Sequence, residues 1–167
     1  MRLRNPEPNP FYLFRVLKRF LSIITQPTLW MILFIVWMSA LFGLSSISLD
    51  VPEEVSKMPH FDKIAHFGYF FGGGIILSTW LMLQYDDKKI PVIRKVFIRF
   101  VLPIVFFSLI GAIDEYRQTF VPGRTGNDLY DWLADFLGGT CGVILANSLY
   151  PLHKKFGCRP RSPWKSY

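Results

Sequence analysis

The sequence has few cysteines and lacks the motifs that cysteine-based folds and sites require. Only two of its 167 residues are cysteines, Cys141 in an apolar run and Cys158 in a basic segment. These contexts differ too much to predict a disulfide pair, and no Cys/His spacing typical of zinc sites occurs. No Ser or Cys nucleophile motif is present either. The sequence therefore gives no support for a disulfide scaffold, a zinc fold or a familiar nucleophilic hydrolase.

Charge is missing over long stretches of the chain. No charged residue occurs between Phe20 and Leu49, while 51% of all residues are hydrophobic and 17% are aromatic. Long uncharged stretches that alternate with short charged ones are typical of a polytopic membrane protein, not of a soluble globule. The net charge of +7 would also fit nucleic-acid binding. Basic cytoplasmic loops explain it more simply, so the predicted partner is the lipid bilayer and not nucleic acid.

The hydrophobic pattern predicts an all-α membrane protein with four transmembrane helices and an N-terminal interfacial amphipathic helix. Residues 1–27 are expected to form a disordered tail and a cytoplasmic interfacial helix, in which Arg15, Lys18 and Arg19 share one face. Residues 28–150 form the four-helix domain, and residues 151–167 form a basic cytoplasmic tail. The first apolar run is too long for a signal peptide and no A-x-A site follows, so it is interpreted as a retained anchor.

Proline, glycine and capping residues mark the predicted helix ends. The four spans are expected near residues 28–47, 64–85, 96–118 and 128–150, each long enough to cross about 30 Å of hydrocarbon. Pro103 predicts a kink in the third span, and Pro151 predicts the end of the fourth. The segment 121–124 (VPGR) predicts a type II turn, and Asn127 or Asp128 is expected to cap the last helix.

The distribution of Lys and Arg predicts the orientation. The N-terminal segment, the second loop and the C-terminal tail carry five each, whereas the first and third loops carry two each. Positive charge marks the cytoplasmic side of a membrane protein. We therefore expect a multi-pass cell-membrane protein with both termini in the cytoplasm, and with the first and third loops outside.

Three polar stripes are predicted to meet at the outer end of the helices. They consist of Asp62, His66 and Tyr69; of Asp114, Glu115 and Gln118; and of Asp128, Asp131 and Asp135. Lys63, Arg117 and Arg124 lie close by in sequence and can supply counter-charge. Asp135 lies about 6 Å deeper than Asp131, one helical turn, and an acid at that depth requires a partner such as Arg124 or His66. Glycines 72–74, 138 and 142 are interpreted as packing positions.

Two segments of the sequence resemble the VanZ-like family of small membrane proteins. They are DKIAHFGYF at 62–70 and IDEYRQTFVPGRTGNDLYDWLADFLGGTCG at 113–142. The residues that fall on the positions of the family pattern are Asp62, Lys63, His66, Asp114, Glu115, Gln118, Pro122, Arg124, Asp128 and Asp131. Asp135 stands where the family often has Asn and is a departure from it. The likeness covers roughly residues 28–150.

The resemblance implies a cell-envelope membrane protein, with an expected link to antibiotic resistance. The family is named for a protein that lowers susceptibility to the lipoglycopeptide teicoplanin, and it has no settled biochemical activity. From the residues, the first hypothesis is an outward-facing polar pocket that binds a cell-surface or lipid-linked molecule. Its candidate residues are Asp62, Lys63, His66, Asp114, Glu115, Gln118, Arg124, Asp128, Asp131 and Asp135.

The same residues admit other functions. Lys63, Arg117 and Arg124 would meet phosphate or carboxylate in the binding hypothesis, while the carboxylates accept hydroxyl or amine donors. A membrane-embedded enzyme acting on a lipid-linked substrate is the alternative, with Asp62 and His66 joining Asp114 and Glu115 in acid–base chemistry or as ligands of a divalent metal. One histidine with several carboxylates suits a metal only weakly, so no metal or cofactor is predicted. Ion-coupled transport through Asp135 and a purely architectural ion-pair network are the remaining interpretations.

Overall fold

A computed structural model of the chain describes residues 12, 15–16, 19, 22–48, 54, 58–85 and 90–155, the last four of them by their backbone alone. Within these residues every regular element is a helix. The predicted interfacial amphipathic helix lies largely outside the described residues. The same is true of the tail beyond residue 155, which includes Cys158.

The described part of the chain contains four helical rods. The elements are α2 (Pro27–Leu44), α4 (Phe61–Gln84), α5 (Val92–Val96), the π-helical turn η1 (Phe97–Val101), α6 (Leu102–Gln118) and α7 (Leu129–Lys155). Because α5, η1 and α6 follow one another without a break, they form one rod. Each of the four rods is long and apolar enough to cross a membrane. The prediction of an all-α, multi-pass membrane protein with four spans is confirmed at this level.

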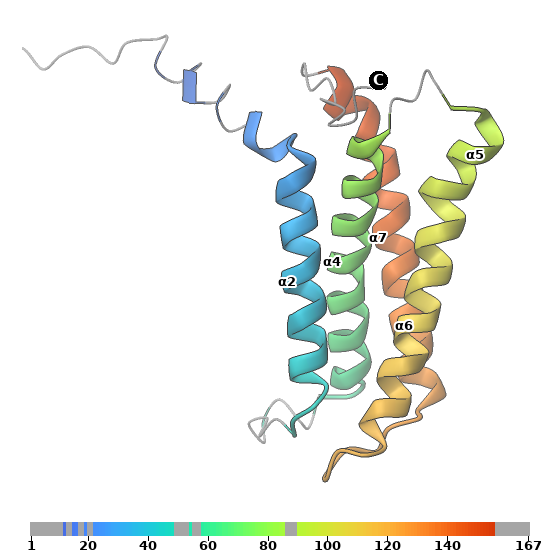
Figure 1. Cartoon of the computed structure of the whole chain (residues 1–167). Coiled ribbons are helices and arrows are strands. Elements are labelled where there is room, and N and C mark those ends of the chain that lie inside the picture. Colours follow the sequence, from blue (N-terminus) through green and yellow to red (C-terminus); the bar gives the residue numbers. More distant parts are fainter. Residues whose placement is uncertain are drawn as a thin grey trace, which may run out of the picture.

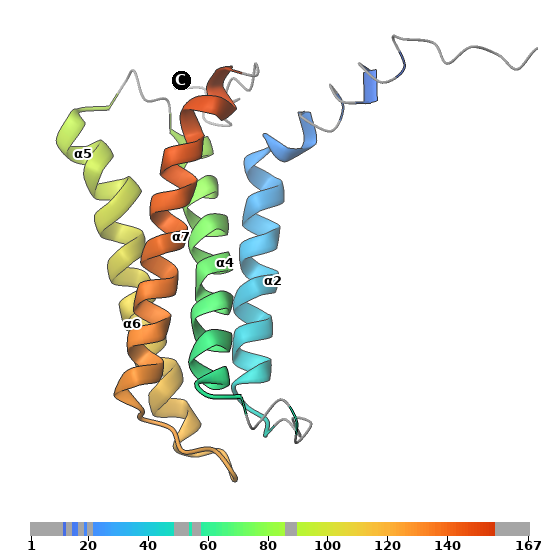
Figure 2. The same cartoon turned by 180° about the vertical axis from the view of Figure 1, so that it is seen from behind.

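The four rods stand side by side, with α4 and α7 in the middle (Figure 1). Seen from behind, α2 lies on one side of this central pair and α6 on the other (Figure 2). Large apolar side chains point outward from the bundle, among them Val36 and Leu109, both 58% exposed. Such outward apolar faces are what a bilayer requires, since lipid replaces water around them. The carboxyl ends of α2 and α6 lie at the same end of the bundle, the lower end in Figure 1.

Helices α4 and α7 touch through their backbones at glycine positions. A Cβ added to Gly74 would collide with the Gly139 carbonyl oxygen and lie 3.0 Å from the Gly142 Cα. A Cβ on Gly142 would likewise meet the Phe71 carbonyl oxygen and lie 3.0 Å from the Gly74 Cα. Small residues that let two membrane helices approach closely are the basis of the Gly-x-x-x-Gly motif. Gly72 differs from these, since a Cβ there would meet nothing within 4 Å.

An aromatic core joins the outer helices to the central pair. Trp37 of α2 packs edge-on against Phe70 and Phe107, with ring centroids 5.7 Å apart in both cases. Its indole Nε1 donates to the Tyr69 carbonyl at 3.1 Å, and the Tyr69 hydroxyl donates back to the Trp37 carbonyl at 2.7 Å. Gly73 makes room for the indole, because a Cβ there would lie 2.6 Å from Trp37 Cε2. These contacts hold α2 against α4 just above the polar end.

Two prolines behave differently from each other. Pro103 is the second residue of α6, just beyond η1, where the helix widens. Since proline has no N–H, the carbonyl of Arg99, four residues earlier, receives no intrahelical bond from it; the Asn147 side chain donates to that carbonyl at 3.2 Å. Pro151 was predicted to end the last helix, and this was wrong: α7 continues through it to Lys155. A proline near a helix end removes one hydrogen bond, which membrane helices tolerate.

Candidate functional site

The polar end of the bundle is closed by a loop that confirms the predicted turn and cap. The Arg124 N–H donates to the Val121 carbonyl at 3.1 Å, and Gly123 has φ +80°, as a type II turn requires. Asp128 caps α7, because its Oδ1 accepts the Tyr130 N–H at 2.8 Å. The N–H of Asn127, a residue with φ +58°, donates to the Glu115 carbonyl at 3.0 Å. The loop thus folds back on the last turn of α6.

All ten candidate residues lie where these helix ends meet, but the structure separates them into three groups. The first is built around Lys63, whose ammonium donates to Asp62 at 2.7 Å and to Asp128 and Asp131 at 2.9 Å each. Lys63 is about a quarter exposed and Asp131 is nearly buried, while the Asp62 carboxylate is 59% exposed. One cation therefore ties the start of α4 to the start of α7.

The contact with Lys63 lowers the pKa of Asp128, which lies just outside the membrane-spanning helices. The hydrogen bond from Lys63, reinforced by the Tyr130 N–H, holds the pKa of the Asp128 carboxyl below its ordinary value. The Asp128 side chain is about a third exposed, so burial opposes this effect only weakly. Asp128 is therefore ionised throughout the neutral range, as an N-cap and ion-pair partner should be.

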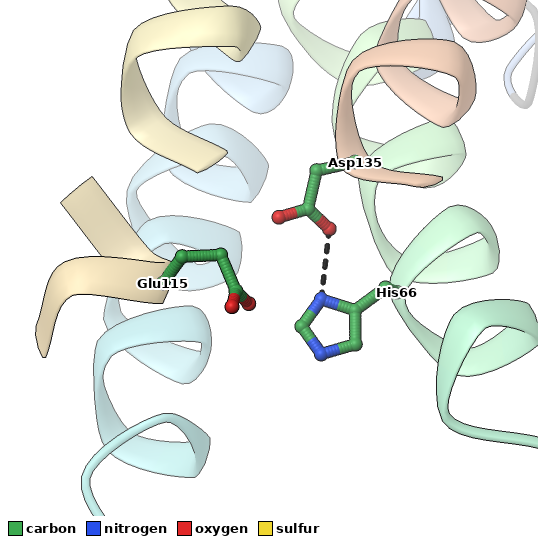
Figure 3. A group of neighbouring side chains, drawn as sticks. All are labelled: His66, Glu115 and Asp135. Atoms are coloured by element: carbon green, nitrogen blue, oxygen red, sulfur yellow. Dashed lines mark hydrogen bonds and ion pairs between the residues drawn. The ribbon is translucent and has the colours of Figure 1, made fainter. Parts of the chain in front are cut away.

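The second group is His66 with Asp135 and Glu115, which come from three different helices (Figure 3). His66 Nδ1 lies 2.9 Å from Asp135 Oδ1. Asp135 is completely buried, and Gly111 provides the space for it, since a Cβ on Gly111 would lie 2.9 Å from the Asp135 Cβ. The Glu115 carboxylate points toward the same imidazole. Asp135, the deep acid, is thus paired with His66, which is one of the two partners expected from the sequence.

The third group is Asp114 with Gln118 and Arg124. Gln118 Nε2 donates to Asp114 Oδ2 at 2.9 Å, and Arg124 reaches Gln118 Oε1 at 3.3 Å. The Arg124 guanidinium also donates to the carbonyls of Leu44 and Ile47, at 3.1 Å each. It therefore satisfies acceptors at the carboxyl end of α2, where a cation is favourable.

Arg117 also contacts the carboxyl end of α2, but it belongs to none of the three groups. It donates to Ser46 Oγ at 2.7 Å and lies over the Phe42 ring, 4.6 Å from its centroid. Ser48 Oγ donates to the Pro122 carbonyl, which fastens the turn to α2. The two arginines and this serine anchor the third loop on the end of the first span.

A cavity of about 370 Å³ opens between α2, α4, α6 and the turn. Its polar lining comes from Ser45, Ser48, Asp62, His66, Tyr69, Asp114, Gln118 and Arg124. Its apolar lining comes from Leu41, Leu44, Phe61, Ala65 and Phe70. A cavity of this size with an apolar wall and a few convergent polar groups is typical of a small-molecule site.

Three buried carboxylates keep one oxygen each without a hydrogen-bond partner among the residues that the structure describes. These oxygens are Asp114 Oδ1, Glu115 Oε1 and Asp135 Oδ2. The three side chains are at most 3% exposed. Lys63 pairs with Asp62, Asp128 and Asp131 instead. Neither Asp114 nor Glu115 has an ion pair within the described part of the chain. The interior of the site is therefore richer in acceptors than in donors.

The contribution of the first span was not predicted. Leu41, Leu44, Ser45 and Ser48 of its carboxyl end line the cavity, and its carbonyls receive Arg124. The serines in the segment 45–48 were the available signal, since hydroxyls at the end of an apolar run are poorly placed for lipid contact. Asp62, in contrast, was predicted to lie in the site beside His66. It was grouped with His66 by helical spacing, yet it lies at the exposed rim and bonds Lys63.

The fold and the site define a multi-pass membrane protein with a polar cavity at one end of a four-helix bundle. Comparison of the chain with protein-family models, with curated proteins and with solved structures gives no match. The resemblance to the VanZ-like family thus rests on the two sequence motifs and remains a prediction.

Proposed function

We propose that the protein is a VanZ-like envelope protein that binds the headgroup of a lipid-linked molecule in this cavity. The observation that carries the proposal is the lining itself. Leucine and phenylalanine side chains line the cavity together with a guanidinium, an imidazole and carboxylates. An amphiphile with an acyl or prenyl chain and a polar head needs both kinds of surface at the end of a transmembrane bundle.

The charges favour a headgroup that is both anionic and rich in hydroxyls. All hydrogen bonds of Arg124 to described residues go to neutral oxygens, so its positive charge is not neutralised by a carboxylate there. A guanidinium in this state suits a phosphate or carboxylate. Asp114 lines the same cavity, and its Oδ1 has no hydrogen-bond partner among the described residues, so this carboxylate suits a sugar hydroxyl. The lipid-linked sugar phosphates of cell-wall synthesis have this chemistry, and a lipoglycopeptide such as teicoplanin shares much of it.

Lipid retention by the purified full-length protein tests the proposal. The protein would be exchanged into nanodiscs that contain a polyprenyl phosphate, and retained lipid would be counted by native mass spectrometry. We expect Arg124→Gln to lose retention and Arg117→Gln to keep it. The two arginines both hold the end of α2, but only Arg124 lines the cavity. Equal retention by the two variants would sink the proposal.

The orientation belongs to the same proposal, since a cell-surface ligand requires the cavity to face outward. The exposed Thr125, in the third loop, is a suitable reporter position. Thr125→Cys in a Cys141→Ser/Cys158→Ser background should react with an impermeant thiol reagent added to intact cells. Labelling that occurs only after permeabilisation would place the cavity on the cytoplasmic side.

A second function, hydrolysis of a lipid-linked substrate, is favoured by the His66–Asp135 pair. Asp135 accepts from Nδ1, which leaves Nε2 on the opposite edge of the ring with no hydrogen bond to any described residue (Figure 3). A histidine oriented by a buried acid in this way can act as a general base toward water. In this case His66→Gln and Asp135→Asn should abolish turnover of a lipid-linked phosphoester, while Arg117→Gln, at a residue that does not line the cavity, should retain it. Full turnover in His66→Gln would remove this function.

A further inference from the structure

The three residues His66, Glu115 and Asp135 form a set that differs from any that the sequence predicted. One ligand atom from each lies within 4.8 Å of the other two, and all three belong to different helices. The metal-ligand set considered from the sequence joined Asp62 and His66 with Asp114 and Glu115, and it did not include Asp135. The observed set contains one imidazole nitrogen and two carboxylates, one of which comes from the deepest acid of α7.

Two of these side chains carry an oxygen that nothing else satisfies. Glu115 Oε1 and Asp135 Oδ2 are buried and have no hydrogen-bond partner among the described residues. Glu115 is 3% exposed and Asp135 is 0% exposed. An unpartnered buried carboxylate oxygen is costly, and the cost is removed by either a proton or a cation. Among the described residues, the one ion pair that these two acids make is that of Asp135 with His66.

We propose that His66, Glu115 and Asp135 bind a divalent transition-metal ion. Metal–ligand bonds of about 2.1 Å place neighbouring ligand atoms about 3.0 Å apart in octahedral geometry and about 3.4 Å apart in tetrahedral geometry. The 2.9 Å between His66 Nδ1 and Asp135 Oδ1 already matches such a neighbouring pair. The Glu115 ligand atom lies within 4.8 Å of the other two. The Glu115 carboxylate, whose Oε2 accepts the Asp128 N–H at 2.8 Å, has to move toward the ion for all three residues to bind it. Because two bonds of about 2.1 Å do not fit in line between atoms 2.9 Å apart, the ion lies to one side of the Nδ1–Oδ1 line, and Nδ1 gives up its proton to solvent when it binds the ion.

The ligand chemistry selects the kind of ion. Imidazole suits Zn²⁺ and Fe²⁺, and carboxylate suits Mn²⁺ and Mg²⁺, so a mixed set favours Zn²⁺ or Mn²⁺ over Ca²⁺. Three protein ligands leave at least one coordination position open, as catalytic sites do. His66 also lines the 370 Å³ cavity, so this position is close to where a headgroup would lie. The metal site stands independently of the proposed lipid binding, because it requires only these three side chains.

Metal binding by the purified full-length protein in detergent tests the proposal. The protein would be stripped with EDTA, incubated separately with Zn²⁺ and Mn²⁺, desalted, and analysed by inductively coupled plasma mass spectrometry and calorimetry. We expect about one ion per chain for at least one of the two metals. The isosteric variants Glu115→Gln and Asp135→Asn should each weaken binding by at least about tenfold. Asp62→Asn, a carboxylate at the exposed rim, should leave both stoichiometry and affinity unchanged.

Thermal unfolding separates loss of the site from loss of the fold. Added metal should raise the Tm of the stripped wild type and of Asp62→Asn, because it binds only the folded state. It should not raise the Tm of Glu115→Gln, even where that variant is as stable as the stripped wild type. The proposal is overturned if neither ion is retained by the wild type. It is also overturned if Glu115→Gln and Asp135→Asn bind as the wild type does, since the metal then lies elsewhere.

Discussion

Removal of the Lys63 ammonium should destabilise the bundle by about 2–3 kcal/mol, well above the effect of an ordinary surface ion pair. Exposed pairs contribute about 0.2–1 kcal/mol, whereas loss of one partner from a buried pair costs about 3–5 kcal/mol. Lys63 is 25% exposed and Asp131 is 11% exposed, which places their contact between these limits. Lys63→Met keeps the apolar stem and removes only the charge. Asp128 and Asp131 then face each other without a counter-ion.

A double-mutant cycle in mixed micelles measures this contribution. The free energy of unfolding would be determined by SDS titration for Lys63→Met, Asp131→Asn and the double variant. We expect the double variant to lose less unfolding free energy than the two single variants lose in total, with a coupling energy of about 1–2 kcal/mol. Asp62→Asn is the matched control and should change stability by less than about 0.5 kcal/mol, since its carboxylate is 59% exposed. If Lys63→Met costs no more than this control, the Lys63 group does not hold α4 and α7 together.

Two further predictions concern the same pair of helices. Gly74→Ala should destabilise the protein by about 1–3 kcal/mol, because the added Cβ would meet backbone atoms of α7. Gly72→Ala is the control, since a Cβ there meets nothing within 4 Å. It should be neutral or slightly stabilising in the same unfolding assay. Lys63→Met should also raise the pKa of the Asp128 carboxyl toward its ordinary value, as measured by ¹³C NMR titration. Because that pKa is lowered in the folded protein, the stabilisation it reports is present above the ordinary Asp pKa and is lost as the pH falls through the lowered value. An unchanged pKa in the variant would contradict the assigned cause.

Helix number, helix type and the polar end were predictable because they depend on local pattern. An uncharged stretch of some 20 residues requires a helix in lipid, whatever its neighbours are. The VPGR turn and the Asp128 cap were also predictable, since turn and cap geometry depend on a few adjacent residues. Pro151 shows the limit of such rules. Proline disfavours a helix on average, but whether one lost hydrogen bond ends a particular helix depends on its surroundings.

The amino-acid pattern alone predicts that carboxylates, a histidine and basic groups gather at one end of a four-helix membrane domain. Helical spacing places residues on a face, but it says nothing about how far each helix is rotated or shifted against the next. The contact of α4 with α7 at Gly74 and Gly142 sets that rotation and shift. The packing of the helices is therefore what brings His66 to Asp135 and Glu115 and pairs Lys63 with Asp128 and Asp131. It also makes the end of α2 part of the cavity lining.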